Sequence, residues 1–165
     1  IVDPNILRGS WAGAFGNFQF MPSTIEKYAI DYNGNNLIEL KSNSDSFASA
    51  ANYLKKMGWN ENEPCFKKIT LKKNVPEKIL NTSAQKINNK KKLKYYKKYI
   101  NEILDFDENL KIAIITPDVD IIDSPKKNDP AYIVFQNYEL VLKWNRSLRF
   151  GLAVCTLKDK LVNEL

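Results

Sequence analysis

The spacing of hydrophobic residues predicts two helices in the first third of the chain. Ser23–Thr–Ile–Glu26 has the form of a capping box with Ser23 as N-cap, and it predicts a helix that ends near Asp31. A second helix is predicted from about 45 to 57, where Gly58 supplies the left-handed stop. The apolar positions that set its period are Phe47, Ala50, Ala51 and Leu54. Together these elements predict a helix-loop-helix unit.

The pattern changes from Asn60 onward, where prolines separate short runs rich in β-branched residues. We expect a small sheet here. Its strands are predicted from the runs Lys68–Leu71, Ile112–Ile115 and Tyr132–Phe135. One basic helix is expected between about 86 and 104, and two helices, 138–144 and 147–165, close the chain. The apolar stripe of the last helix consists of Phe150, Val154, Leu157 and Leu161.

The length and net charge of the chain limit the number of domains and the classes of binding partner. A chain of 165 residues with 44% hydrophobic residues buries one sizeable core, so one main domain with an embellishment is expected. The net charge of +6 favours an anionic partner, which could be a nucleic acid, a phospholipid surface or an acidic polysaccharide. The lysines and tyrosines of 86–99 are interpreted as a solvated helix face, with attraction to anionic cell wall or lipid as the alternative. No apolar run has transmembrane length.

The chain has no histidine, which excludes Ser-His and Cys-His nucleophile pairs and His-rich zinc sites. Any catalysis must therefore use carboxylates, amides or hydroxyls. Cys65 and Cys155 are too far apart in sequence for a metal knuckle, so a disulfide and two free thiols both remain open. Cys155 lies on an apolar helical face, where a buried inert thiol is the favoured interpretation.

The segment Gly9–Ser23, here called the Gly-rich segment, is the strongest candidate for binding. It holds three of the six glycines, and Gln19 lies between Phe18 and Phe20. Glycines let a ligand approach the backbone, and an amide framed by aromatic rings offers both a donor and an acceptor. This composition suits a sugar-binding wall. Close packing between helices is the alternative.

Four segments of the chain form a pattern that is typical of one protein family: Ser10–Thr24, Tyr28–Asp31, Ala51–Trp59, and Lys143–Ser147 followed by Phe150. By these segments the chain closely resembles the B-type lytic murein transglycosylases of bacteria. The resemblance implies an α+β fold, a mainly helical lysozyme-like domain with a small inserted β-sheet region. By this resemblance 1–60 holds substrate-binding helices with an EF-hand-like loop, 61–136 is a small α/β insertion, and 137–165 completes the lysozyme-like domain.

The resemblance also implies a reaction. Such enzymes cleave the MurNAc-GlcNAc β-1,4 bond of peptidoglycan and form 1,6-anhydroMurNAc, with one glutamate acting first as general acid and then as base. That glutamate lies upstream of the Gly-Ser-x-Ala-Gly motif, and the eight residues before Gly9 contain none. Neither Glu26 nor Glu39 lies in a matching motif. We therefore expect the C-terminal portion of a transglycosylase, inactive alone and without a catalytic residue, or alternatively a non-catalytic peptidoglycan-binding remnant.

The same resemblance implies a set of substrate-binding residues. Flat aromatic faces suit the C–H faces of pyranose rings, and amides suit hydroxyl and N-acetyl groups. Trp144 and Phe150 stand where the family commonly has tyrosines, so two hydroxyl contacts would be lost. The set is Ser10, Gln19, Phe20, Tyr53, Trp144, Asn145 and Phe150.

The loop between the first two helices has oxygen-bearing side chains at its first, third and fifth positions, as in an EF-hand. The related loop is longer and closes with an aspartate. The implied Ca²⁺ ligands are the side chains of Asp31, Asn33, Asn35 and Asp45 and the backbone carbonyl of Leu37. Two carboxylates neutralise the ion incompletely, so binding is expected to be weak. No cofactor is expected to be required.

The resemblance implies peptidoglycan glycan strands as partner and the bacterial periplasm or cell envelope as location. We expect a monomer, with membrane anchoring only through a segment outside this chain. Nucleic acid is not expected as a partner, because the basic cluster at 86–99 lacks a recognisable nucleic-acid-binding motif.

Overall fold

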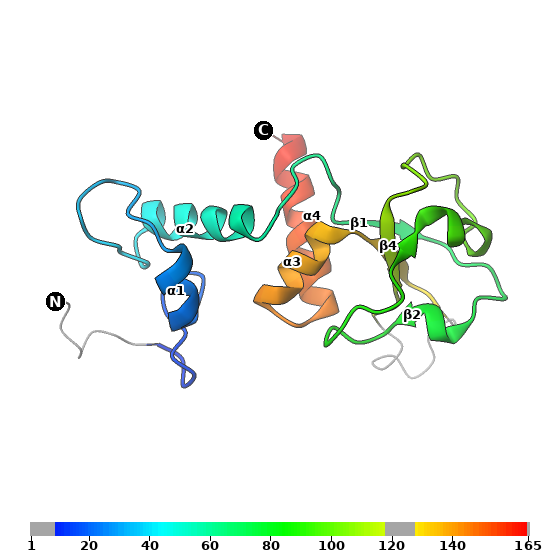
Figure 1. Cartoon of the computed structure of the whole chain (residues 1–165), viewed down its shortest axis with the longest axis horizontal. Coiled ribbons are helices and arrows are strands. Elements are labelled where there is room, and N and C mark those ends of the chain that lie inside the picture. Colours follow the sequence, from blue (N-terminus) through cyan, green and yellow to red (C-terminus); the bar gives the residue numbers. More distant parts are fainter. Residues whose placement is uncertain (1–8, 118–127, 165) are drawn as a thin grey trace. The chain divides into compact units, whose positions relative to one another are not determined.

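A computed structural model describes residues 9–117 and 128–164 of the chain (Figure 1). The chain divides into two compact units, Ile1–Trp59 and Asn60–Leu165. The first unit contains five basic and five acidic residues, so the net charge of +6 resides entirely in the second. The predicted three-part division of the chain stays a prediction.

The first unit contains α1, Pro22–Tyr28, and α2, Asn43–Lys56. Both helices were predicted, but the capping box was wrong. Met21 is the N-cap of α1 and no side chain caps that end. Pro22 at the first helical position explains the difference, because its fixed φ starts the helix before Ser23 and it has no N–H to satisfy.

The buried face of α2 is largely polar, which the apolar period did not predict. Phe47 is 61% exposed, and of the four predicted positions only Ala50 is buried. The buried residues of α2 are Asp45, Ser46, Ser49, Ala50 and Tyr53. Polar groups withdrawn from water need hydrogen-bond partners, and the neighbouring segments of the first unit provide them.

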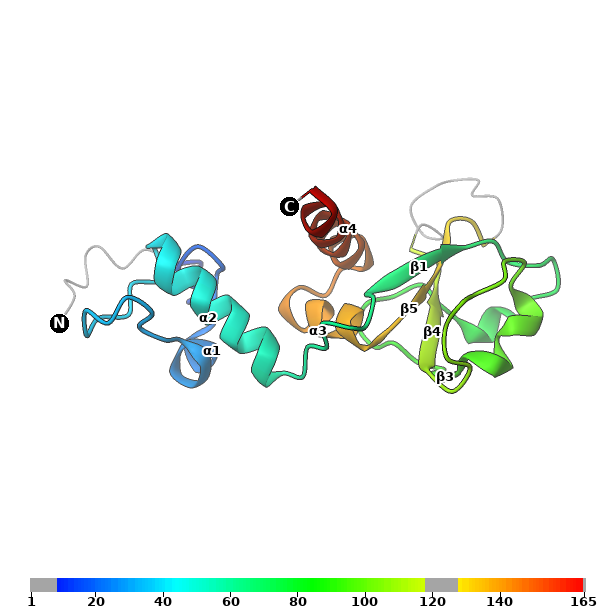
Figure 2. The same ribbon diagram turned by 90° about the horizontal axis from the view of Figure 1, so that it is seen from above.

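The second unit is built on a five-stranded sheet (Figure 2). The order is β1-β5-β4-β2, and β3 also pairs with β4. The strands are β1 (Phe66–Ile69), β2 (Leu80–Asn81), β3 (Lys91–Lys92), β4 (Lys111–Ile115) and β5 (Ala131–Val134). β5 pairs antiparallel with both β1 and β4, whereas β2 runs parallel to β4. The three predicted runs correspond to β1, β4 and β5.

The predicted basic helix at 86–104 was wrong. The region contains β3 and two short 3₁₀ turns, η3 (Leu93–Tyr95) and η4 (Lys97–Tyr99). Asn89 has a left-handed backbone (φ 57°), and β3 pairs antiparallel with β4, so the chain is extended where a helix was expected. Another 3₁₀ turn, η2, spans Glu77–Ile79.

The apolar residues of this region supply much of the sheet's core. The lysines and tyrosines of this stretch were interpreted as a solvated helix face, but Tyr96 is buried there together with Leu93 and Ile100. The buried cluster comprises Ile69, Leu93, Tyr96, Ile100, Leu104, Ile112, Ile114, Ala131, Ile133 and Phe135. Burial of such side chains contributes about 1.5–3 kcal/mol each relative to exposure.

Two helices close the chain, as predicted: α3, Gln136–Trp144, and α4, Leu148–Glu164. The fully buried Tyr138 donates its hydroxyl to the Leu148 carbonyl at 2.6 Å, and its ring packs on Gly151. A Cβ at Gly151 would lie 2.8 Å from that ring, so only glycine fits. None of the helices in the described ranges is long and apolar enough to cross a membrane.

A disulfide joins Cys65 to Cys155 of α4, with a Cα–Cα distance of 6.0 Å and a sequence separation of 90. The interpretation of Cys155 as a free buried thiol was therefore wrong. The predicted apolar stripe of α4 is also partly exposed within this unit, since Leu157 is 58% and Leu161 51% exposed. The helix is anchored instead through Cys155, which is fully buried.

Asn137 binds the start of the second unit to α3. Its side chain is fully buried and donates to the carbonyls of Asn60 (2.7 Å) and Glu63 (2.6 Å). It also accepts a hydrogen bond from the backbone N–H of Asn60 at 3.0 Å. The three hydrogen bonds of this amide take the place of those it would make to water, and they fix the segment that leads into β1.

Candidate functional site

The Gly-rich segment begins with a tight turn. The backbone N–H of Ser10 donates to the Ala14 carbonyl (2.9 Å), and the Ser10 Oγ accepts from the Ala14 N–H (3.1 Å). Gly13 lies in the left-handed region at φ 81° and donates to the Ser10 carbonyl. The exposed Ser10 hydroxyl keeps its own proton available for a ligand.

A second turn follows directly and presents Gln19. Phe15 and Phe20 exchange two backbone hydrogen bonds of 2.9 Å, which close the turn. Gln19 has φ 51°, uncommon for a residue other than glycine, and its Nε2 donates to the Gly16 carbonyl at 2.9 Å. A Cβ at Gly16 would lie 2.7 Å from the Cβ and carbonyl oxygen of Leu40. The turn is therefore held tightly, with an exposed amide at its tip.

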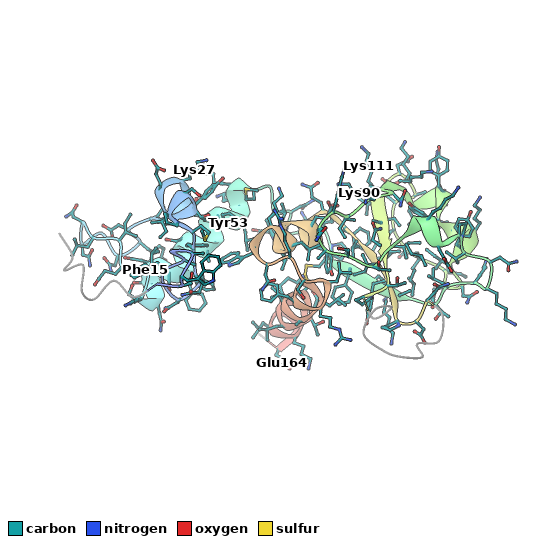
Figure 3. The ribbon with its side chains drawn as sticks, turned by 90° about the horizontal axis from the view of Figure 1, so that it is seen from below. Phe15, Lys27, Tyr53, Lys90, Lys111 and Glu164 are labelled. Atoms are coloured by element: carbon teal, nitrogen blue, oxygen red, sulfur yellow. A yellow bond between two sulfur atoms is a disulfide. The ribbon has the colours of Figure 1, made fainter. Side chains whose placement is uncertain are left out.

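Two other predicted residues of the first unit meet each other. The ring centroids of Phe20 and Tyr53 are 6.0 Å apart, and Tyr53 makes an edge contact with Tyr28 at 5.1 Å. Phe20 is 4% and Tyr53 9% exposed. Figure 3 labels Tyr53 on α2. Burial, and secondarily Tyr28, raise the pKa of Tyr53, which keeps its hydroxyl protonated. These rings form the base beneath the Gly-rich turns.

Trp11 is a candidate that the sequence reasoning missed. It follows Ser10 within the Gly-rich segment and is fully exposed in the structure. A large exposed aromatic ring is unusual on a soluble surface and suits stacking on a sugar. The sequence did contain a sign of this exposure, because the neighbours Ser10, Ala12 and Gly13 are too small to cover the Trp11 ring.

The polar face of α2 holds the Gly-rich segment in place. Asn17 donates its backbone N–H to Leu40 (2.8 Å) and its Nδ2 to the hydroxyl of Ser46 (3.2 Å). Ser49 accepts from the N–H of Ile30 (3.0 Å) just after α1. Asn52 likewise donates to the Tyr28 carbonyl at 2.8 Å.

The loop between α1 and α2 is organised by hydrogen bonds from backbone N–H groups to the predicted ligand oxygens. Asp31 accepts from Gly34 and Asn36, both at 2.7 Å. Asn33 Oδ1 accepts from Asn35 and Asn35 Oδ1 from Leu37. Asn36 takes the left-handed conformation at φ 66°, which asparagine tolerates better than most residues. The Asx turns thus give this loop its shape.

Asp45 closes the loop from α2. Its fully buried carboxylate accepts from the N–H groups of Glu39 (2.9 Å) and Tyr32 (3.1 Å). The Glu39 hydrogen bond lowers the pKa of Asp45 below its usual value, in spite of burial. The donor set, two carboxylates and three neutral oxygens, fits a hard cation such as Ca²⁺ in type but is low in charge. Within the described ranges, no three acidic, cysteine or histidine side chains gather as a metal site.

The C-terminal predicted binding residues lie at the turn from α3 to α4. Asn145 ends α3 and is exposed, while Trp144 and Phe150 are half-buried. Ser147 Oγ accepts from the Phe150 N–H at 3.2 Å, which caps the start of α4. Trp144, Asn145 and Phe150 therefore lie together in the second unit, whereas the other predicted residues lie in the first.

Residues 1–159 match the family model described as Transglycosylase SLT domain. The chain belongs to this transglycosylase family. It is similar to membrane-bound lytic murein transglycosylase B of Escherichia coli (strain K12), with 49% identity over 57 aligned residues. The aligned region is 34% of this chain and 16% of that protein.

Solved structures of the family share its fold. Catenated lytic transglycosylase SltB1 from Pseudomonas aeruginosa matches with a TM-score of 0.79 and 24% identity, over 99% of this chain and 51% of that one. SltB3 of the same organism, in complex with NAG-NAM-pentapeptide, matches with a TM-score of 0.78 and 27% identity, over 96% and 41%. The predicted lysozyme-like α+β fold is confirmed, and the chain spans about half the length of these relatives.

The Asp45 carboxylate gives the first unit a pH-dependent stability. Because its folded-state pKa is lowered, the stabilisation is fully present above the ordinary pKa and is lost as pH falls through the folded-state value. We expect Asp45→Asn to lower the melting temperature by several degrees at pH 7, and the deficit to shrink below about pH 4. Thermal unfolding followed by circular dichroism across pH 3–7 measures this.

Glu26→Gln, which removes an exposed carboxylate from α1, is the matched control and should change little. A deficit for Asp45→Asn that stays constant from pH 7 to pH 3 would contradict the role given to this carboxylate.

Proposed function

We propose that this chain is the C-terminal, glycan-binding portion of a peptidoglycan lytic transglycosylase. The whole enzyme would cleave the MurNAc-GlcNAc β-1,4 bond and form 1,6-anhydroMurNAc. The observation that carries the proposal is the family match over residues 1–159, joined to the Gly-rich segment that presents Gln19 on a left-handed backbone. The complex of the related SltB3 with NAG-NAM-pentapeptide supports the substrate class.

In the first unit, Gln19 and Ser10 would bind sugar hydroxyl and N-acetyl groups. Both are exposed and lie on turns whose backbones are fixed, so little ordering entropy is lost on binding. Trp11 adds an exposed ring for stacking on a pyranose face. Phe20 and Tyr53 would support this surface from below, with the protonated Tyr53 hydroxyl as a further donor.

In the second unit, Asn145 would supply an amide to the glycan, and Trp144 and Phe150 would supply apolar ring surface. The turn that carries them is fixed, because Asn145 donates its backbone N–H to Val141 (3.2 Å) and its carbonyl accepts from Ser147 (2.8 Å). The absence of phenol hydroxyls at Trp144 and Phe150 favours stacking over hydrogen bonding at these two positions.

We further propose that no carboxylate of this chain is the general acid. Such an acid needs a raised pKa. The pKa of Asp45 is lowered by hydrogen bonding. The pKa of Glu102 is also lowered, because its desolvation is outweighed by hydrogen bonds from Thr70. Glu63 accepts from Asn137, and Glu139 pairs with Lys90 at 3.0 Å. The expected position of the acid, upstream of Gly9, lies outside the described residues, and 1–8 contain no glutamate. The chain alone would then bind glycan without cleaving it.

A chimera separates this enzyme portion from a non-catalytic remnant. The chain alone, incubated with purified peptidoglycan, should release no 1,6-anhydromuropeptides detectable by mass spectrometry. When it replaces the matching half of SltB1, the chimera should release them. Robust product from the chain alone would refute the missing acid. A folded chimera that binds peptidoglycan without cleaving it would favour the remnant.

Substitution of the proposed amides should weaken glycan binding. Gln19→Ala and Asn145→Ala should each reduce the affinity for insoluble murein about tenfold, because each removes hydrogen bonds to the ligand while leaving its polar groups desolvated. Asn62→Ala and Asn74→Ala, at exposed sites of the second unit, are matched controls that should leave affinity unchanged. Equal retention of all four variants in a pull-down would reject the site.

We also propose weak calcium binding by the loop Asp31–Asp45. The oxygens of this loop are suitable in type, but only two of the ligands carry charge, and each already accepts backbone hydrogen bonds. Calorimetric titration with CaCl₂ should give a dissociation constant no tighter than about 10⁻⁴ M. A submicromolar site would contradict this. The proposed reaction requires no cofactor.

The proposed substrate places the protein in the bacterial periplasm or cell envelope, acting on peptidoglycan glycan strands as a monomer. Any membrane anchoring would come from a segment outside this chain. Recovery of the tagged protein in the cytoplasmic rather than the envelope fraction of its host would contradict this location.

A further inference from the structure

The second unit has a polar pocket at one edge of its sheet. β2 and β3 both pair with the same edge of β4, β2 along Ile114–Ile115 and β3 along Lys111–Ile112. The segment 82–90, which joins them, borders a pocket of about 230 Å³. Its polar lining includes Lys78, Thr82, Ser83, Lys86, Asn88 and Asn89.

Hydrogen bonds to the sheet fix the shape of this pocket. Asn81, 5% exposed, donates to the Ile114 carbonyl (2.8 Å) and accepts from the N–H of Asn88 (2.7 Å). Asn89 donates its Nδ2 to the Lys78 carbonyl at 2.6 Å. The buried Tyr96 donates its hydroxyl to the Asn89 carbonyl. These hydrogen bonds fix the segment 82–90 against β4 and against the residues that precede β2.

The groups that remain available in the pocket are mainly donors. In the described part of the chain, the side chains of Lys78, Lys86 and Thr82 make no hydrogen bond or ion pair. Ser83 Oγ accepts from the Gln85 N–H, so its hydroxyl proton is left to donate. No carboxylate lines the pocket. Two ammonium groups beside two hydroxyls are suited to an oxyanion.

The surroundings of the pocket are strongly basic. The stretch 67–98 contains twelve lysines and one acidic residue, Glu77. Lys92 and Lys111 lie directly opposite each other on β3 and β4, an arrangement of like charges that destabilises a sheet. Figure 3 labels Lys111, and Lys90 just before β3. Ion pairs among the described residues engage Lys90 and Lys97 of this stretch. The remaining charge favours an external anion.

We propose that this pocket binds a carboxylate or phosphate group carried by an anionic polymer, and that the lysines around it attract that polymer. Carboxylates of the peptide stems on peptidoglycan are one source of the oxyanion, and this source rests on the proposed function. Phosphate groups are the other source and do not depend on it. The pocket lies in the second unit, apart in sequence from the residues assigned to the glycan.

The test uses the whole chain and three probes: NAG-NAM-pentapeptide, the same disaccharide without peptide, and sodium tripolyphosphate. Backbone amide chemical shifts of residues 78–89 report on the pocket. We expect them to move with tripolyphosphate or with the peptide-bearing sugar. A response to the peptide-bearing sugar identifies a stem carboxylate as the oxyanion, and a response to tripolyphosphate alone identifies a phosphate. Shifts in the Gly-rich segment with the peptide-free disaccharide report separately on the proposed glycan site.

Lys78→Gln/Lys86→Gln should weaken the binding of the responding probe by at least about tenfold, since two charge-assisted hydrogen bonds are lost. Lys72→Gln/Lys73→Gln is the matched control, because it removes the same charge from exposed lysines outside the pocket and should cost about twofold or less. The proposal is overturned if neither tripolyphosphate nor the peptide-bearing sugar shifts residues 78–89. It is also overturned if both double variants lose affinity equally.

Discussion

Hydrogen bonds from one polar face of α2 hold the first unit together. Ser46 holds the Gly-rich segment through Asn17, Ser49 and Asn52 hold the chain around the end of α1, and Asp45 holds the loop that connects the two helices. A buried polar group left without its partner costs about 1–3 kcal/mol, so these contacts specify one arrangement more strictly than apolar packing would. The conformation of the proposed sugar-binding turns depends on them.

The second unit is stabilised by different interactions. Its sheet is stabilised by an apolar core, a disulfide from the start of β1 to α4, and the buried amide of Asn137. Its surface carries the whole net charge of the chain. The two units thus offer different chemistry to a ligand: neutral amides, hydroxyls and rings in the first, and additional ammonium groups in the second. A polymer that is both a glycan and an anion would match both.

The sequence predicted those elements whose local pattern and tertiary packing agree. β4, β5 and α3 carry apolar residues that are buried in the structure, and they lie within two residues of the expected ranges. α4 also lies in its expected range, although its apolar stripe is partly exposed. The stretch 86–104 was misassigned as a helix from its lysine- and tyrosine-rich composition, whereas the left-handed Asn89 and the pairing of β3 with β4 prevent a helix. Pairing between strands overrode the local preference of the sequence there.

The site was predictable in part, for a related reason. Gln19 was evident because it lies between two aromatic rings in the segment that resembles the family. The glycines were evident because tight turns and close approach to the backbone favour that residue. The contributions of Asn17, Ser46 and Ser49 were not, since serine and asparagine suit any surface and become specific only through partners distant in sequence. Trp11 was passed over because exposure, rather than residue type, distinguishes a ligand platform from a core residue.

Hydrogen-deuterium exchange of the chain with and without a soluble NAG-NAM oligosaccharide tests the central claim, that the turns held by α2 bind glycan. The account predicts slower exchange in the peptide covering residues 9–20, and loss of that protection in Ser46→Ala, which removes the contact with Asn17. Unchanged exchange in this peptide at saturating sugar, or protection that persists undiminished in Ser46→Ala, would contradict it.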